Sequence, residues 1–280
     1  MSVIGGLDHA ILLVRDLDRG EALAADLGFR ASPRGIHSPA MGTANTTLML
    51  ADGTYLEMMT VRRETALNAR LAAQLRRREG LTGLAFKSDD ARQAAAAFEA
   101  AGVADGEAVS FSRPVEAEGG PRDAAFTIAR IEGGATPTAF AFVCQHHTPD
   151  LVWRDDLLRH PNGAQGLASL VGVALDLEAL AQAWRRVLGE TGVKVTDGQV
   201  ELGIVPPPVT FLSPMAFAER FGTTTVEHPP ALAGAQVRVA DPDRVVGLLR
   251  EADVSFGRPG PGRILVRQVF GAFIEFVEAT

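Results

Sequence analysis

The 280-residue sequence has little of what several protein classes require. Its single cysteine, Cys144, excludes an internal disulfide framework and an all-thiolate zinc cluster, and it fits a reducing compartment. With 27 Lys and Arg against 34 Asp and Glu and no long basic run, the chain is a poor candidate for binding nucleic acid or a membrane surface. No basic segment precedes the first short apolar run, and no apolar stretch is long enough to span a bilayer. We therefore expect a cytoplasmic globular protein without a signal peptide.

Common catalytic and nucleotide-binding motifs are also missing. The sequence contains no Ser-His-Asp order, no P-loop and no GxGxxG element. The glycine-rich segment Phe256–Arg263 precedes an expected strand rather than a helix, so it lacks the helix start that binds phosphate.

What the chain does contain is one pattern repeated four times. Each copy has an apolar run, an aspartate and a helical pattern closed by glycine or aspartate. The aspartates are Asp16, Asp90, Asp176 and Asp241, and the closing residues are Gly28, Gly102, Gly189 and Asp253. The spacing from aspartate to closing residue is 12, 12, 13 and 12 residues. Aspartate caps helix N-termini, and glycine tolerates the left-handed conformation that ends a helix, so each copy predicts a strand followed by a helix.

Each copy continues with further strands. The expected hairpins pair Thr46–Ala51 with Thr54–Thr60, Ala125–Ile131 with Thr138–Gln145, Val200–Val205 with Val209–Leu212, and Arg263–Val269 with Ala272–Glu278. A shorter strand is expected before each hairpin, at Arg30–Ser32, Glu107–Phe111, Lys194–Thr196 and Ser255–Gly257. The unit is therefore β-α-β-β-β, which predicts an α+β fold.

Three local features complete this description. Asp18 and Glu21 have the spacing of a capping box, and Arg63–Arg78 is expected to form an extra helix. The turn-rich segment from His160 is expected to link two domains of two units each, residues 1–160 and 161–280.

Paired βαβββ units are similar to the vicinal oxygen chelate superfamily, which includes glyoxalase I, extradiol dioxygenases and bleomycin-resistance proteins. The resemblance lies in LDHAILLVRDLD at Leu7–Asp18, LGF at Leu27–Phe29 and DGTYLEMM at Asp52–Met59. More narrowly, HSPAMGTANTTLML from His37 and HPNGA from His160 resemble the glyoxalase-like-domain family. The resemblance implies two glyoxalase-like domains, each with a mixed sheet curled into a cup.

In that superfamily a divalent metal, such as Zn, Mn, Ni or Fe, is held by the first and last strands of both units. His9 and Glu57 match the two ligand positions of unit one. In unit two, Gly83 replaces the histidine, and the last-strand position is expected near Cys144 or Gln145. The resemblance therefore implies an incomplete metal site made of His9 and Glu57, or no cofactor at all.

In the second domain, Ser169 and Gly234 replace the histidines, and Glu275 alone matches a ligand position. Neither serine nor glycine offers a ligand suited to a transition ion, so we expect no metal in that domain.

Other residues are candidates because of their chemistry and place. A glutamate on a strand between apolar neighbours needs a partner, and His9 would supply one for Glu57. Asp8 is expected to point to the opposite face of its strand from His9. The remaining candidates are His37 as a second catalytic group beside Glu57, and Thr43, Asn45 and Tyr55 as substrate-binding residues.

We expect His9, His37, Asn45 and Glu57 to meet in one cavity. His146 or His147 is a candidate third ligand at a strand end, whereas Cys144 is expected to be a buried, inert thiol because no flanking base lowers its pKa.

Three functions stay open. The first is a metal-dependent lyase or isomerase of glyoxalase type, in which a glutamate moves a proton. The second is a metal-free small-molecule binding or resistance-like protein, which the incomplete ligand set favours. The third, extradiol ring cleavage with Fe(II), ranks last because the second domain lacks its histidines. Each implies a small oxygen-bearing ligand, and a homodimer is left open.

Overall fold

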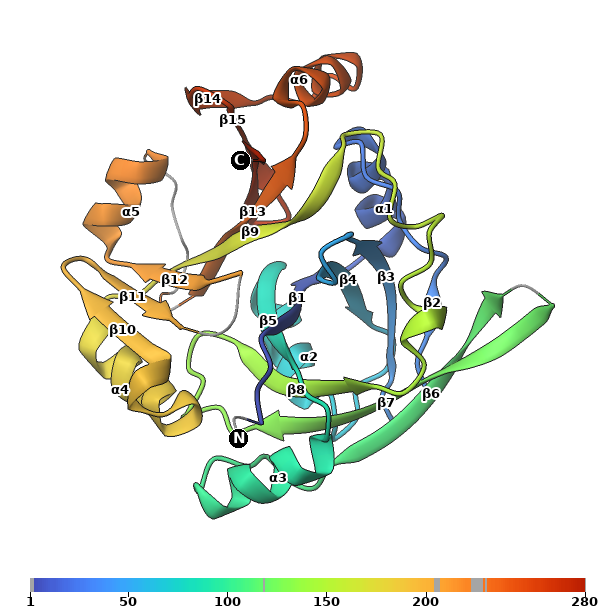
Figure 1. Cartoon of the computed structure of the whole chain (residues 1–280), viewed down its shortest axis with the longest axis vertical. Coiled ribbons are helices and arrows are strands. Elements are labelled where there is room, and N and C mark those ends of the chain that lie inside the picture. Colours follow the sequence, from blue (N-terminus) through green and yellow to red (C-terminus); the bar gives the residue numbers. More distant parts are fainter. Residues whose placement is uncertain (1–2, 118, 204–206, 223–228, 230, 280) are drawn as a thin grey trace.

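The structure, a computed structural model, describes residues 3–117, 119–203, 207–222, 229 and 231–279. Its strands form two mixed sheets of eight strands each, and the first sheet curls nearly into a barrel (Figure 1). The four βαβββ units are confirmed, and each sheet contains two of them.

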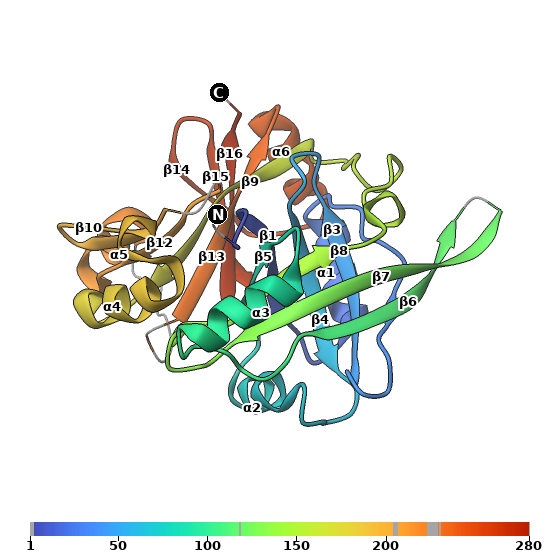
Figure 2. The ribbon, with the colours of Figure 1, turned by 60° about the horizontal axis from the view of Figure 1, so that its bottom comes forward.

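The two units of the first sheet meet where β1 pairs with β5. In spatial order the strands are β2 (Gly35–Ile36), β3 (Thr43–Met49), β4 (Tyr55–Val61), β1 (Leu7–Leu13), β5 (Gly80–Lys87), β8 (Phe140–His146), β7 (Gly120–Ile131) and β6 (Val109–Ala117). The helices are α1 (Leu17–Asp26) and α3 (Ala91–Ala100) within the units, and α2 (Ala69–Arg77) between them. The hairpin of β6 and β7 projects from the rest of the molecule (Figure 2).

The second sheet repeats this order. Its strands are β10 (Val193–Thr196), β11 (Gln199–Leu202), β12 (Val209–Leu212), β9 (Ala164–Val173), β13 (Ala231–Val239), β16 (Ala272–Glu278), β15 (Arg263–Val269) and β14 (Gly257–Gly260). The helices are α4 (Leu177–Leu188), α5 (Pro214–Phe221) and α6 (Pro242–Glu251). Single 3₁₀ turns lie at Pro149–Leu151 and Glu190–Gly192. No helix in the described ranges is long and apolar enough to cross a membrane.

The repeated aspartates and closing residues act as predicted. Each aspartate side chain accepts a hydrogen bond from a backbone N–H in the first turn of its helix. The closing residues Gly28, Gly102, Gly189 and Asp253 have φ values of 74°, 66°, 74° and 54°. These are left-handed conformations, which glycine adopts without steric cost.

Four local predictions are corrected. Asp18 and Glu21 form no capping box, because Asp16 is the cap and both side chains bind Arg34 instead. The extra helix begins only at Ala69, because Asn68 holds the preceding segment in a loop through Thr65 N–H and the carbonyl of Arg63.

The short strand expected at Arg30–Ser32 lies instead at Gly35–Ile36. Ser32 N–H donates to the Thr47 carbonyl, but Thr47 N–H donates to the Ser32 side chain rather than to its carbonyl, and Pro33 has no N–H to donate. The last short strand likewise begins at Gly257 rather than Ser255. Ile204 and Val205, at the end of another expected strand, lie outside the described residues.

The first strand of every unit contains a β-bulge at the same place. Where β1 pairs with β5, Leu7 lies opposite Phe86 and His9 lies opposite Ala85, so Asp8 is an extra residue without a partner in the register. The equivalent extra residues are Thr82 in β5, Ala168 in β9 and Ala233 in β13. A bulge interrupts the alternation of side chains along a strand.

The segment that follows the first sheet is hydrogen-bonded to the residues after α1 and to the end of β3. His160 Nδ1 accepts a hydrogen bond from Arg30 N–H at 3.0 Å, and His160 Nε2 bonds the Met49 carbonyl at 2.7 Å. Asn162 is buried and donates to the Leu27 carbonyl at 2.9 Å. Both residues therefore have the structural role expected of the link between the sheets.

Candidate functional site

An acid–base chain lies in the cup of the first sheet. His9 Nε2 is 3.3 Å from Glu57 Oε2, and His9 Nδ1 is 2.6 Å from Asp8 Oδ1. His146 Nε2 lies 3.2 Å from the same Asp8 oxygen. Three of the four are buried, and the His146 side chain is nearly so. Both ring nitrogens of His9 are thus held by carboxylates.

The position of Asp8 corrects the sequence analysis. Regular alternation would point Asp8 away from His9, whereas its carboxylate bonds the His9 ring. The reason is the bulge at Asp8, which interrupts the alternation of β1 and lets two consecutive side chains contact each other. Asp8 is therefore a site residue that sequence periodicity concealed.

Two polar side chains of β3 adjoin this chain. Asn45 donates to Glu57 Oε1 through its amide nitrogen, which fixes the orientation of the amide. Thr43 bonds His37 Nδ1 at 2.7 Å, so the loop carrying His37 is fastened over the strand.

One cavity is lined by all four residues that were expected to meet: His9, His37, Asn45 and Glu57. Thr43 and Tyr55 line the same cavity. Their roles in catalysis, substrate binding or metal binding stay predictions.

The cavity has a volume of about 70 Å³. Its polar residues lie among apolar walls, and the Tyr55 ring stacks on His9 with 4.3 Å between ring centroids. The main apolar lining residues are Met59, Leu71, Phe111, Phe126, Phe140 and Phe142. A site with a few converging polar groups in an apolar wall is typical of small-molecule binding.

Charge interactions oppose desolvation in this chain. Burial alone lowers the pKa of His9, but its bonds to Asp8 and Glu57 outweigh burial and raise the pKa to about 9. Burial raises the pKa of both Asp8 and Glu57. Bonds from His146 and His9 nevertheless hold the pKa of Asp8 below its ordinary value, and contacts chiefly with His9 do the same for Glu57. Burial lowers the pKa of His37 despite the nearby Glu57 charge. At neutral pH the acid–base chain therefore contains a His9 imidazolium between the Asp8 and Glu57 carboxylates, and the nearby His37 is neutral.

The metal-binding set of the superfamily does not fit this cup. Ile11, two residues after His9, pairs with Glu57, and Ala85, two residues after Gly83, pairs with Phe142. The last-strand position of unit two is therefore Phe142, not Cys144 or Gln145 as predicted.

A β-carbon on Gly83 would lie 2.7 Å from the Ile11 side chain, so no ligand could replace this glycine without repacking. Among the described residues, no third histidine, cysteine or carboxylate joins His9 and Glu57 in a metal-binding group.

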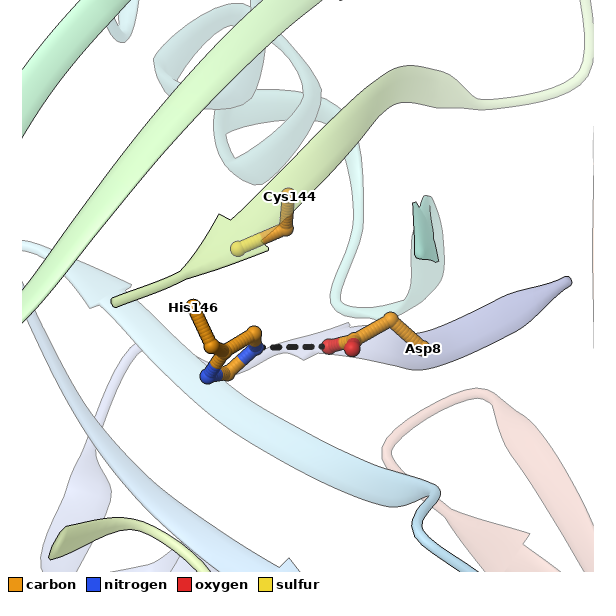
Figure 3. A group of neighbouring side chains, drawn as sticks. All are labelled: Asp8, Cys144 and His146. Atoms are coloured by element: carbon orange, nitrogen blue, oxygen red, sulfur yellow. Dashed lines mark hydrogen bonds and ion pairs between the residues drawn. The ribbon is translucent and has the colours of Figure 1, made fainter. Parts of the chain in front are cut away.

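A different group could hold a cation. Ligand atoms of Asp8, Cys144 and His146 lie within 4.8 Å of one another, from β1 and β8 (Figure 3). Cys144 and His146 are two residues apart on β8, and the Cys144 sulfur points toward the His146 ring (Figure 3). Carboxylate, thiolate and imidazole together suit a divalent ion such as Zn²⁺. Burial raises the pKa of the Cys144 thiol, as expected of an inert cysteine, so a metal would have to displace its proton. His147 is not in this group and bonds Thr127.

The equivalent cup of the second sheet is closed by its own side chains. Glu275 is fully buried, and Arg263 donates to both of its oxygens at 2.9 and 2.7 Å. Gln236 donates to Glu275 at 2.6 Å and accepts from Ser169. A β-carbon on Gly234 would lie 2.4 Å from the Phe273 ring. The absence of metal from this domain stays a prediction, and the Arg263–Glu275 pair supplies a physical reason for it.

Arg113 is a charged lining residue that was not predicted from the sequence. It is the middle residue of β6 and is buried, whereas its neighbours Ser112 and Pro114 are exposed. The strand does alternate, because Val109, Phe111, Val115 and Ala117 are partly buried on the face that carries Arg113. An arginine in the middle of that apolar face is the signal in sequence that could have found it.

Comparisons with known proteins support this architecture. A family model described as "Glyoxalase-like domain" matches residues 7–188. No curated protein matches the sequence. A crystal structure of a hypothetical protein from Staphylococcus aureus has 12% identity and a TM-score of 0.67, covering 98% of this chain and 99% of that one.

Two further solved structures share the fold. A triple mutant of 4-hydroxymandelate synthase from Streptomyces coelicolor has 16% identity and a TM-score of 0.58, covering 98% of this chain and 92% of its own. An Mn(II)-bound glyoxalase from Novosphingobium aromaticivorans has 15% identity and a TM-score of 0.57, covering 99% and 83%. At these identities the likeness concerns the fold alone.

Proposed function

The chain belongs to the glyoxalase-like domain family of the vicinal oxygen chelate superfamily, and from this premise we propose that its first cup binds a small oxygen-bearing molecule without a metal at the superfamily's position. The observation that carries the proposal is the His9–Glu57 contact of 3.3 Å inside an apolar cavity. A ligand carbonyl or hydroxyl would bond these groups and Asn45, and its apolar part would pack on the phenylalanines. We place the protein in the cytoplasm, and a homodimer stays a prediction that light scattering would test.

Binding is favoured over proton abstraction by the charge state of the pair. A general base works best when its pKa lies near the working pH. Contacts with His9 hold the pKa of Glu57 below its ordinary value, so Glu57 is a weak base while His9 is protonated. The lyase and isomerase activities considered above would need a ligand that first displaces His9.

The test is a screen of compact fragments that carry a carbonyl, hydroxyl, amide or carboxylate group, followed by protein NMR. We expect hits to shift resonances of cup residues and to lose affinity in His9→Gln and Glu57→Gln. The matched control is Ser169→Ala, at the position of the second cup equivalent to His9. Hits that bind both cup variants as tightly as the wild type would contradict the proposal.

A second candidate function is favoured by the Asp8–Cys144–His146 group: a divalent-metal site displaced from the superfamily's position, with Asp8 one residue before His9 and Cys144 two residues after Phe142. Metal analysis after incubation with Zn²⁺, Mn²⁺, Ni²⁺ or Fe²⁺ and removal of excess would test it. One retained ion per chain, lost in both Cys144→Ser and His146→Ala but kept in His147→Ala, supports the site. No retained ion, or retention in the first two variants, excludes it.

A further inference from the structure

Arg113 is a buried residue in the lining of the cup, and its guanidinium has no protein partner. Its residue is 8% exposed, and among the described residues no hydrogen bond or ion pair to Arg113 exists. Other inward-facing arginines have at least one protein partner: Arg70 Nη2 donates to two backbone carbonyls, and Arg263 binds Glu275. No Arg113 nitrogen is among the fully buried unpaired atoms, so the guanidinium donors face the open space of the cavity, where a ligand can accept from them.

Arg113 lines the same cavity as Glu57 but forms no ion pair with it. The Glu57 carboxylate is engaged by His9 and Asn45, and no Arg113 nitrogen lies within 4.0 Å of it. A β-carbon on Gly35 would lie 2.9 Å from Arg113 Nη1, so the absence of a side chain on β2 leaves the path of the guanidinium open. Arg113 is thus placed beside the acid–base chain with free donors.

We propose that the ligand of this cup is a small monocarboxylate, bound by Arg113 through its carboxylate and packed through an apolar chain or ring on the phenylalanine walls. This inference rests on the proposed function and narrows it. A planar guanidinium matches a carboxylate with two parallel hydrogen bonds. A phosphate is disfavoured, because the cavity also holds the Glu57 carboxylate, which repels a dianion more strongly than a monoanion, and because Arg130, the second arginine of the lining, is engaged by Asp105.

The test compares carboxylates with neutral analogues of nearly the same shape. Propionate, butyrate and benzoate are titrated by calorimetry against the wild-type protein, in parallel with propionamide, butyramide and benzamide. We expect at least one carboxylate to bind about tenfold or more tightly than its amide, the ratio that a charge-assisted pair provides. In Arg113→Met that ratio falls to about one, whereas amide binding is retained. Arg122→Met, an exposed arginine on the neighbouring strand β7, keeps the wild-type ratio.

Stability separates a ligand-binding role from a structural one. Because Arg113 has no partner, Arg113→Met should unfold at the same or a higher temperature than the ligand-free wild type, whereas loss of a structural arginine would lower the midpoint. Amides that bind as tightly as carboxylates would overturn the inference and leave the proposed function intact. If none of the six compounds binds, the inference is overturned, and the fragment screen decides the proposed function separately.

Discussion

The buried His9 imidazolium should make the stability of the protein depend on pH. The pKa of His9 is raised from 6.5 to about 9 in the folded chain. At about 1.4 kcal/mol per pKa unit, this shift corresponds to about 3 kcal/mol of stabilisation. Because the folded-state pKa is the higher one, the stabilisation is fully present below pH 6.5 and is lost as the pH rises through about 9. The lowered pKa values of Asp8 and Glu57 have the opposite effect, since their stabilisation is lost as the pH falls.

Substitutions of Asp8 and Glu57 measure how much each carboxylate contributes to the raised pKa of His9. Asp8→Asn should lower the pKa of His9 more than Glu57→Gln does, because the Asp8 contact is 2.6 Å and the Glu57 contact is 3.3 Å. Both variants should lose less free energy of unfolding between about pH 6 and about pH 9.5 than the wild type loses. His147→Ala, which removes a ring outside this chain, should keep the wild-type pH dependence.

The measurements are an NMR titration of the His9 ring in EDTA-treated protein and urea unfolding at the two pH values. Each variant is compared with the wild type at both pH values, so that a general loss of stability cancels. A His9 that titrates near 6.5 in the wild type would refute the reasoning, as would an equal loss of unfolding free energy in all four proteins.

Three further substitutions test the packing and capping. Gly83→Ala should destabilise the protein by about 1–3 kcal/mol, because the new β-carbon would lie 2.7 Å from a β1 side chain. Its control is Gly247→Ala, in open space on α6, which should be neutral or stabilising. Thermal unfolding compares the two variants. Arg263→Met leaves the Glu275 carboxylate buried without its ion pair and should cost about 3–5 kcal/mol in urea unfolding; a loss below 1 kcal/mol would contradict the closed second cup. Asp90→Ala removes the cap of α3 and should cost about 1 kcal/mol, measured by thermal unfolding; an unchanged midpoint would show that the cap is dispensable.

The repeated units could be predicted because their signals are local. A capping aspartate, an amphipathic run and a left-handed closing residue lie within one helix, and the bounds of β12, β15 and β16 match the prediction residue for residue. Helix α5 was missed although Ser213 caps it and Pro214 opens it, and although it lies at the same place between two units as the predicted helix α2.

The site was predictable only where its residues follow regular alternation. His9 and Glu57 lie on strands whose side chains alternate, so their common cavity could be expected from sequence. The direction of Asp8 depends on how β1 pairs with β5, a strand that begins more than seventy residues later. The alternation of β6 indicates that Arg113 points to the apolar face, but the cavity it enters depends on the curl of the first sheet and on the open space at Gly35. Such long-range pairing is not encoded in any short sequence motif.

The bulge at the start of each unit has a consequence for how such proteins change. In a regular strand, every second side chain faces the cavity. The bulge also brings the side chain of the preceding residue against one of these cavity-facing side chains. Thr82, Ala168 and Ala233 occupy this geometry in the other three units, and Asp8 alone is ionisable. The backbone thus presents four equivalent positions for an acid beside the ligand-facing residue of the first strand, of which one is used. A single substitution at the other three could add a carboxylate without moving the backbone, so one duplicated scaffold can lose reactivity in one domain and keep it in the other.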